Sequence, residues 1–169
     1  MPLLSDPSEE AQQVANLFRW FRGGTVSAFS QIEFSMCRLL SCFRKTQEFA
    51  EGLERLPYNA EARSETFRRV FEANTKLEPF VSEAREICDA FDAIITLRSY
   101  MAHGFARIDM NQRVVQMRKF RPEKGNEWNE DQWDIAFDKL EPWAMQIDAL
   151  SQAAVGLCIR VSKTFDLGF

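Results

Sequence analysis

The sequence predicts an all-α protein: an up-and-down bundle of about five helices, with a short β-hairpin inserted before the C-terminal helices, in a single domain over residues 1–169. Three observations favour this fold. Apolar residues recur at helical steps of three and four along most of the chain. Phenylalanine (15 residues) outnumbers glycine (7), which favours a phenylalanine-packed interior over a many-turned β fold. The 169 residues are also enough to bury such a core.

Two helices are predicted in the N-terminal part of the chain. The first has Asp6 as its N-cap, Pro7 in its first turn and Glu9 at the capping-box position three residues after the cap. Gly23-Gly24 is predicted to end it. A second, long helix is expected over about residues 25–51. Its apolar stripe comprises Phe29, Ile32, Met36, Leu40 and Phe43, with Glu33 beside it.

A third and a fourth helix follow a turn at residues 56–59. Asn59 is expected to cap the third helix, which runs to about Asn74. Pro79 is expected to open the fourth helix, which ends at His103 before Gly104. The apolar stripe of the fourth helix comprises Phe80, Ala84, Ile87, Phe91, Ile94 and Met101, with Arg98 in one of its slots.

Beyond Gly104 the pattern changes to two short strands, residues 105–108 and 114–120, around a turn at 109–112. A polar loop is expected over residues 121–129. Asn129 with Gln132 resembles a second capping box and predicts a short helix through Phe137. Pro142 is expected to begin a further helix or to kink this one. The face of the last helix comprises Trp143, Ile147, Leu150, Ala154, Leu157 and Val161.

Composition narrows the class of protein. The formal net charge of −4 argues against a general nucleic-acid coat protein. No stretch has the roughly 20 apolar residues of a membrane span, and no secretory signal is visible, so we expect a cytoplasmic protein without membrane contact. The four cysteines lie in apolar helical patterns and are expected to be core thiols. With one histidine and no CxxC pair, neither a metal site nor a cofactor is predicted.

Arg98 and His103 form the arrangement in the sequence most suited to chemistry. His103 is the only histidine, and it ends a polar ridge that also contains Ser99. On an ideal helix Arg98 and His103 lie roughly 140° apart, since each residue turns about 100°. The long arginine side chain can bridge this angle, so both groups could face one cleft.

These two residue types suit metal-free cleavage of RNA. Histidine ordinarily titrates near neutral pH and can act as a general base toward a 2′-hydroxyl. Arginine can stabilise charge on a phosphoryl oxygen. A single histidine cannot easily serve as both base and acid, and a symmetric dimer would supply the second one. Alternatively, Arg98 is a structural arginine paired with Glu33, and His103 is an ordinary residue at a helix end.

The stretch from Leu97 to Gly104 resembles the R-x4-6-H motif of HEPN domains, the "higher eukaryotes and prokaryotes nucleotide-binding" family. The resemblance implies a dimeric helical bundle acting as a metal-independent endoribonuclease in a toxin–antitoxin, anti-phage or stress-response role. Arg98 and His103 would be its catalytic residues and Glu33 a supporting acid. Ser99 stands where the family most often has asparagine, and Phe105 replaces the tyrosine through which some family toxins are silenced. An antitoxin or another regulatory protein would be a further partner.

A local excess of positive charge follows the motif. Residues 98–124 contain seven basic and two acidic residues, a pattern that suits RNA contact through Arg107, Arg118 and Lys119. An ordinary solvated hairpin has the same pattern. Three tryptophans offer either stacking surfaces or core packing: Trp128, Trp133 and Trp143. The alternative function is a non-catalytic HEPN-like dimer that binds a partner protein or a nucleotide.

Overall fold

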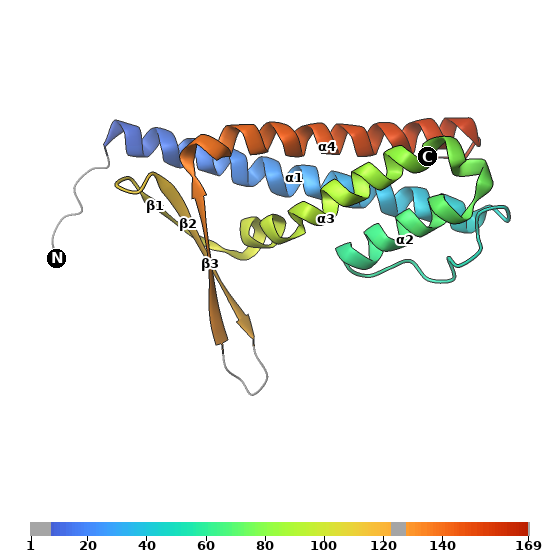
Figure 1. The fold of residues 1–169 in the computed structure, drawn as a ribbon, viewed down its shortest axis with the longest axis horizontal. Coiled ribbons are helices and arrows are strands. Elements are labelled where there is room, and N and C mark those ends of the chain that lie inside the picture. Colours follow the sequence, from blue (N-terminus) through green and yellow to red (C-terminus); the bar gives the residue numbers. More distant parts are fainter. Residues whose placement is uncertain (1–7, 123–127, 169) are drawn as a thin grey trace. The chain divides into compact units, whose positions relative to one another are not determined.

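The computed structural model describes residues 8–122 and 128–168. These residues form four α-helices, one 3₁₀ helix and three strands (Figure 1). The helices are α1 (Glu9–Lys45), α2 (Ala60–Ala73), η1 (Thr75–Phe80), α3 (Val81–His103) and α4 (Phe137–Thr164). The strands are β1 (Phe105–Asp109), β2 (Val114–Pro122) and β3 (Trp128–Ala136). The predicted mostly helical class is confirmed, but the described residues form four α-helices rather than about five.

The chain divides into two compact units. The first, called the sheet unit below, comprises Met1–Val26 and Leu97–Gln146. The second, called the helical unit, comprises Ser27–Thr96 and Ile147–Phe169. Arg98 and His103 therefore belong to the sheet unit, together with all three strands.

The helical unit is built around phenylalanine side chains, as the composition predicts. Phe29 of α1 stacks on Phe91 of α3 with ring centroids 4.4 Å apart. Phe43 of α1 meets Phe71 of α2 edge-on at 6.0 Å. All four rings are buried. Since each buried aromatic ring removes a large apolar area from water, these contacts are a main source of cohesion in the unit.

Two asparagines set the boundaries around α2. The Asn59 side chain accepts a hydrogen bond of 2.8 Å from the Ala62 amide, which confirms the predicted N-cap. The Asn74 side chain accepts a hydrogen bond from the Lys76 amide and begins η1. The prediction that Pro79 opens the fourth helix is wrong by two residues, because Pro79 lies inside η1 and α3 begins at Val81.

Gly23-Gly24 does not end a helix, contrary to the prediction. Helix α1 continues through both glycines to Lys45, so the two predicted N-terminal helices are one, and it ends six residues before Glu51. Phe21 and Thr25, on either side of the glycines, are both buried. Tertiary packing thus outweighs the cost of about 1 kcal/mol per glycine. The predicted cap at Asp6 and the following Pro7 lie outside the described residues, while the Ser8 hydroxyl accepts a hydrogen bond from the Ala11 amide.

The three strands form one antiparallel sheet in the order β1-β2-β3 (Figure 1). The predicted hairpin of β1 and β2 is confirmed, with Phe105 opposite Arg118 and Asp109 opposite Val114. The turn between them is held by the Asp109 side chain, which accepts hydrogen bonds from the Asn111 and Gln112 amides.

The short helix predicted over residues 129–137 is wrong, because these residues form most of β3, and α4 begins only at Phe137. Asn129 and Gln132 are strand residues rather than parts of a capping box. Two cross-strand ion pairs support the strand: Arg118 with Glu130 and Arg121 with Asp131. The expected polar loop is correspondingly shorter, and its residues 123–127 lie outside the described ranges. Pro142 lies inside α4.

One face of the sheet is packed and the other is open. Val115, Met117 and Ile135 are buried on the packed face. On this face Trp133 of β3 contacts Tyr100 of α3 at 5.4 Å and Trp143 of α4 at 6.0 Å between ring centroids. Trp133 and Trp143 therefore serve packing rather than stacking on a ligand, while the side chain of Trp128 lies outside the described residues.

Candidate functional site

The chain passes from α3 to β1 through one residue, Gly104. The Gly104 amide donates a 2.7 Å hydrogen bond to the Tyr100 carbonyl oxygen, which continues the helical pattern one step past His103. A Cβ at Gly104 would lie 2.6 Å from that same oxygen and 3.1 Å from Met117 Cε. Glycine is thus required here for close packing of the backbone, and not for a left-handed conformation.

Arg22 of α1 fixes this junction. Its Nε donates a hydrogen bond of 2.7 Å to the Met101 carbonyl oxygen, and its Nη2 donates one of 3.1 Å to the Gly104 carbonyl oxygen. Carbonyl groups at a helix C-terminus have no partner within the helix, so Arg22 satisfies acceptors that would otherwise need water. The sequence does not reveal this role of Arg22, because nothing in the local pattern of α1 marks a contact with a segment about 80 positions away.

His103 is exposed and lines a cleft of about 350 Å³ in the sheet unit. The other lining residues come from β1, β2 and β3: Phe105, Arg107, Arg118, Lys119, Phe120 and Glu130. The structure therefore brings together His103 and the three basic residues predicted for RNA contact. Three cationic side chains against one carboxylate give the cleft a positive character within a chain of net charge −4.

Two of the cations have protein partners. Arg118 Nη1 lies 3.1 Å from a carboxylate oxygen of Glu130, while Arg118 Nε is buried without a hydrogen-bond partner among the described residues. Lys119 Nζ donates a 2.9 Å hydrogen bond to the Ser99 hydroxyl and lies 4.6 Å from the centroid of the Tyr100 ring. The structure thus joins Ser99, the residue after Arg98, to the basic strand β2.

Arg98 is half-buried on the last turns of α3, and the residues that line the described cleft do not include it. Glu33 lies in the helical unit, where its carboxylate accepts a hydrogen bond of 2.5 Å from Arg63 Nη1 of α2. Both side chains of this ion pair are mostly buried. The sequence does not reveal Arg63 as a partner of Glu33, because helical periodicity shows which residues share a stripe but not which residues face it from another helix.

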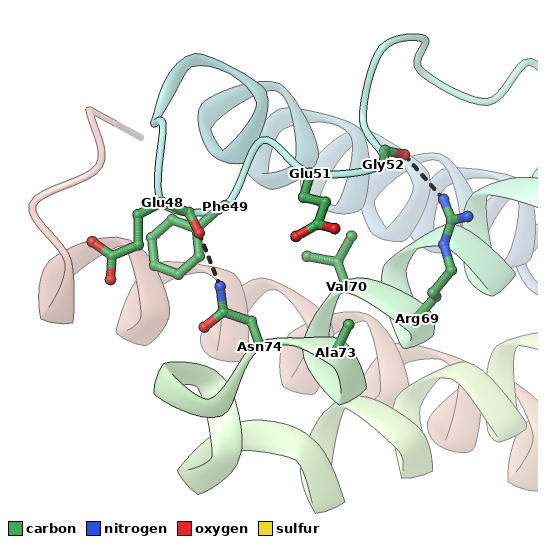
Figure 2. A pocket seen from close by; sticks show the side chains of 8 residues that line it. All are labelled: Glu48, Phe49, Glu51, Gly52, Arg69, Val70, Ala73 and Asn74. Carbon is green, nitrogen blue, oxygen red and sulfur yellow. Dashed lines mark hydrogen bonds between the residues drawn. The ribbon is translucent and has the colours of Figure 1, made fainter.

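The helical unit contains another cleft, of about 320 Å³, which no motif in the sequence predicts (Figure 2). Arg69 donates a hydrogen bond to the Gly52 carbonyl oxygen, and the Asn74 side chain amide donates one to the Glu48 carbonyl oxygen, each at 3.1 Å (Figure 2). Gly52 has φ +73°, a conformation that favours glycine. The polar side chains here hold the segment between α1 and α2, so we assign this cleft a structural role.

The cysteine thiols are placed for packing rather than for reactivity. All four cysteines are free thiols, with Cys88 and Cys158 buried and Cys37 and Cys42 half-buried. Burial raises the pKa of Cys158 to about 12, with a further contribution from Cys88, so its thiolate is scarce at neutral pH. Within the described residues no group of three or more histidine, cysteine or acidic side chains could hold a metal ion.

No helix in the described parts of the chain has the length and apolarity needed to cross a membrane. A scan against models of protein families matches none of them, and searches of curated proteins and of solved structures return no similar protein. Inference about function therefore rests on the motif and on the geometry of the sheet unit.

Proposed function

We propose that this protein is a metal-independent endoribonuclease of HEPN type that cleaves RNA at a composite site in a homodimer. The observation that carries the proposal is the position of His103. It is exposed at the end of α3 and shares a cleft with Arg107, Arg118 and Lys119. A histidine beside several cationic side chains suits RNA cleavage without a metal, because it can act as a general base while the cations contact phosphates.

The proposed reaction is an internal transesterification. His103 takes the proton of a 2′-hydroxyl, whose oxygen then attacks the neighbouring phosphorus. Arg98 stabilises the negative charge on the phosphoryl oxygens in the transition state. The P–O5′ bond breaks, and the leaving oxygen takes a proton from His103 of the second copy, giving a 2′,3′-cyclic phosphate and a 5′-hydroxyl end. Arg107 and Arg118 bind backbone phosphates and hold the strand in place.

A regulated nuclease fits a toxin–antitoxin, anti-phage or stress-response role, in which an antitoxin or another protein restrains the activity. Control through a tyrosine two residues after the histidine is not part of the proposal, since Phe105 occupies that position and lacks a hydroxyl. Ser99 supports the site through its hydrogen bond from Lys119. Glu33 remains a proposed supporting acid whose partner in the helical unit is Arg63.

The test is cleavage of a labelled RNA in EDTA by the wild type and by His103→Ala and Arg98→Ala. We expect wild-type cleavage to persist in EDTA and to leave a 2′,3′-cyclic phosphate, while both variants fold and lose activity by at least about 100-fold. Arg44→Ala, an exposed arginine of α1 in the helical unit, is the matched control and should remain active.

Cleavage that needs a metal ion, or that survives His103→Ala, would overturn the proposal. The non-catalytic alternative predicts a different result. In that case the wild type cuts no RNA, and Arg98→Ala lowers the free energy of unfolding by several kcal/mol because the half-buried arginine has a structural role.

A further inference from the structure

We propose that the open face of the sheet binds single-stranded RNA by stacking bases on Phe105 and Phe120. This inference rests on the proposed function and specifies its substrate: the strand presented to His103 is unpaired. Three features of the described residues point to such a strand: two exposed aromatic rings, the basic residues beside them, and the histidine in the same cleft.

Phe105 and Phe120 are unusually exposed for aromatic strand residues, at 70% and 66%. Phe105 lies opposite Arg118, and Phe120 lies two residues further along β2, so the two rings project from the same face on neighbouring strands. Diagonal neighbours of this kind lie about 7–8 Å apart, with their Cβ atoms somewhat closer together. Two rings at such a spacing on a sheet are suited to receive consecutive bases, because every base offers a π-face.

The surroundings of the rings select a polyanion rather than an apolar partner. Arg118 lies opposite Phe105, and Arg107 lies two residues along β1 on the same face. Phe105 also borders a second hollow of about 380 Å³, where Arg19 and Arg22 of α1 are lining residues. Basic residues thus line both hollows that Phe105 borders, and Arg107 and Arg118 can contact phosphates while the ring contacts a base.

An unpaired strand fits this surface better than a duplex. In a double helix the flat faces of the bases are stacked on one another and are not available to side chains. Stacking on Phe105 and Phe120 requires bases that are splayed away from their neighbours. A single strand is also flexible enough to align its 2′-hydroxyl for in-line attack, as the proposed reaction at His103 requires, whereas a duplex holds the backbone in a regular helical geometry.

The experiment measures RNA binding separately from RNA cleavage. In a His103→Ala background, fluorescence anisotropy reports the affinity for a labelled single-stranded 12-mer and for the same sequence in a duplex. The aromatic variants are Phe105→Thr and Phe120→Thr, because threonine keeps the β propensity and has no ring. Phe120→Trp tests rescue by another stacking ring. Phe34→Thr, which removes a 64% exposed ring from the helical unit, is the matched control.

We expect the single strand to bind at least tenfold more tightly than the duplex, and each ring deletion to weaken binding by about tenfold. The tryptophan variant and the Phe34 control should bind like the background protein. Equal affinity for duplex and single strand, or unchanged affinity after both ring deletions, overturns the inference. Ring deletions that abolish self-association in sedimentation, with RNA affinity unchanged, assign the face to a contact between copies and also overturn it.

The two proposals can fail separately. Ring-dependent binding by a protein whose wild type does not cleave RNA would refute the nuclease and leave the binding face standing. If the wild type cleaves RNA and both ring deletions leave that cleavage unchanged, the binding face is refuted and the nuclease stands. A fall in thermal midpoint of the variants would reveal misfolding, so that a binding loss is attributed to the rings only when the midpoint is retained.

Discussion

Arg22 donates a hydrogen bond of 2.7 Å to the carbonyl oxygen of Met101, two residues before the only histidine of the chain. Its second hydrogen bond, to the Gly104 carbonyl oxygen, lies just beyond that histidine. One guanidinium therefore holds the backbone on both sides of His103. The planar fork of arginine suits two separate acceptors, which a lysine ammonium cannot reach with the same geometry.

Replacement of Arg22 should loosen this junction. We expect Arg22→Ala to lower the free energy of unfolding by about 2 kcal/mol, since two charge-assisted hydrogen bonds to half-buried carbonyls are lost. Arg22→Lys should lower the free energy of unfolding by a smaller amount, because a lysine can keep only part of these hydrogen bonds. Urea denaturation measures the stability, and amide hydrogen exchange at Gly104 and Phe105 should accelerate in the alanine variant. Arg19→Ala is the control, because the Arg19 side chain bonds Asn16 on its own helix. Exchange rates unchanged in Arg22→Ala would contradict the assigned role.

The glycine pair inside α1 should be a site of easy stabilisation. A Cβ added at Gly23 or Gly24 meets no atom within 4 Å. Alanine is the better helix former by about 1 kcal/mol, so Gly23→Ala and Gly24→Ala should each raise the free energy of unfolding by about that amount. Gly104→Ala should instead lower the free energy of unfolding, because its Cβ would collide with the Tyr100 carbonyl oxygen. Thermal and urea midpoints of the three variants would check this, and a loss of stability at either α1 position would refute it.

Stability should fall at alkaline pH through Cys158. Its pKa is about 12 in the folded protein against an ordinary value of 9.0, chiefly because burial disfavours the thiolate. Above pH 9 the unfolded chain releases this proton while the folded chain keeps it, so the unfolded state is favoured increasingly up to about pH 12. Below pH 9 this contribution to the free energy of unfolding is fully present. At about pH 10.5 the free energy of unfolding is lower by about 2 kcal/mol.

Urea denaturation at about pH 8 and pH 10.5 measures this loss. The Cys158→Ala variant should be less stable at both pH values because it leaves a cavity, but its stability should decline less between them. Cys42→Ala serves as the control for removing a thiol. An equal decline in the wild type and in Cys158→Ala would show that other groups cause the loss of stability at alkaline pH.

Local signals in the sequence predicted those features that short-range physics determines. The side chain of Asn59 caps α2 because its amide oxygen lies next to unpaired amides of the same turn. The end of α3 at His103 and the hairpin of β1 and β2 also follow from patterns a few residues long.

The sequence could not predict features that depend on distant partners. Strand β3 carries Glu130 and Asp131, acidic residues with low β propensity, which are stabilised in a strand by basic side chains of β2. The continuity of α1 through Gly23-Gly24 depends on packing, which local propensity does not include. Likewise, the contact of Arg22 with the α3 terminus joins segments far apart in the chain.

The single residue between α3 and β1 has a consequence for where a bound strand would be cut. Two consecutive Cα–Cα steps separate His103 from Phe105, so their Cα atoms can be at most about 7.6 Å apart whatever the rest of the fold does. In the proposed complex, a base stacked on Phe105 would therefore lie close to the His103 imidazole. The short connection through Gly104 would place the cleaved bond near the stacked base, without any contact that reads the identity of that base.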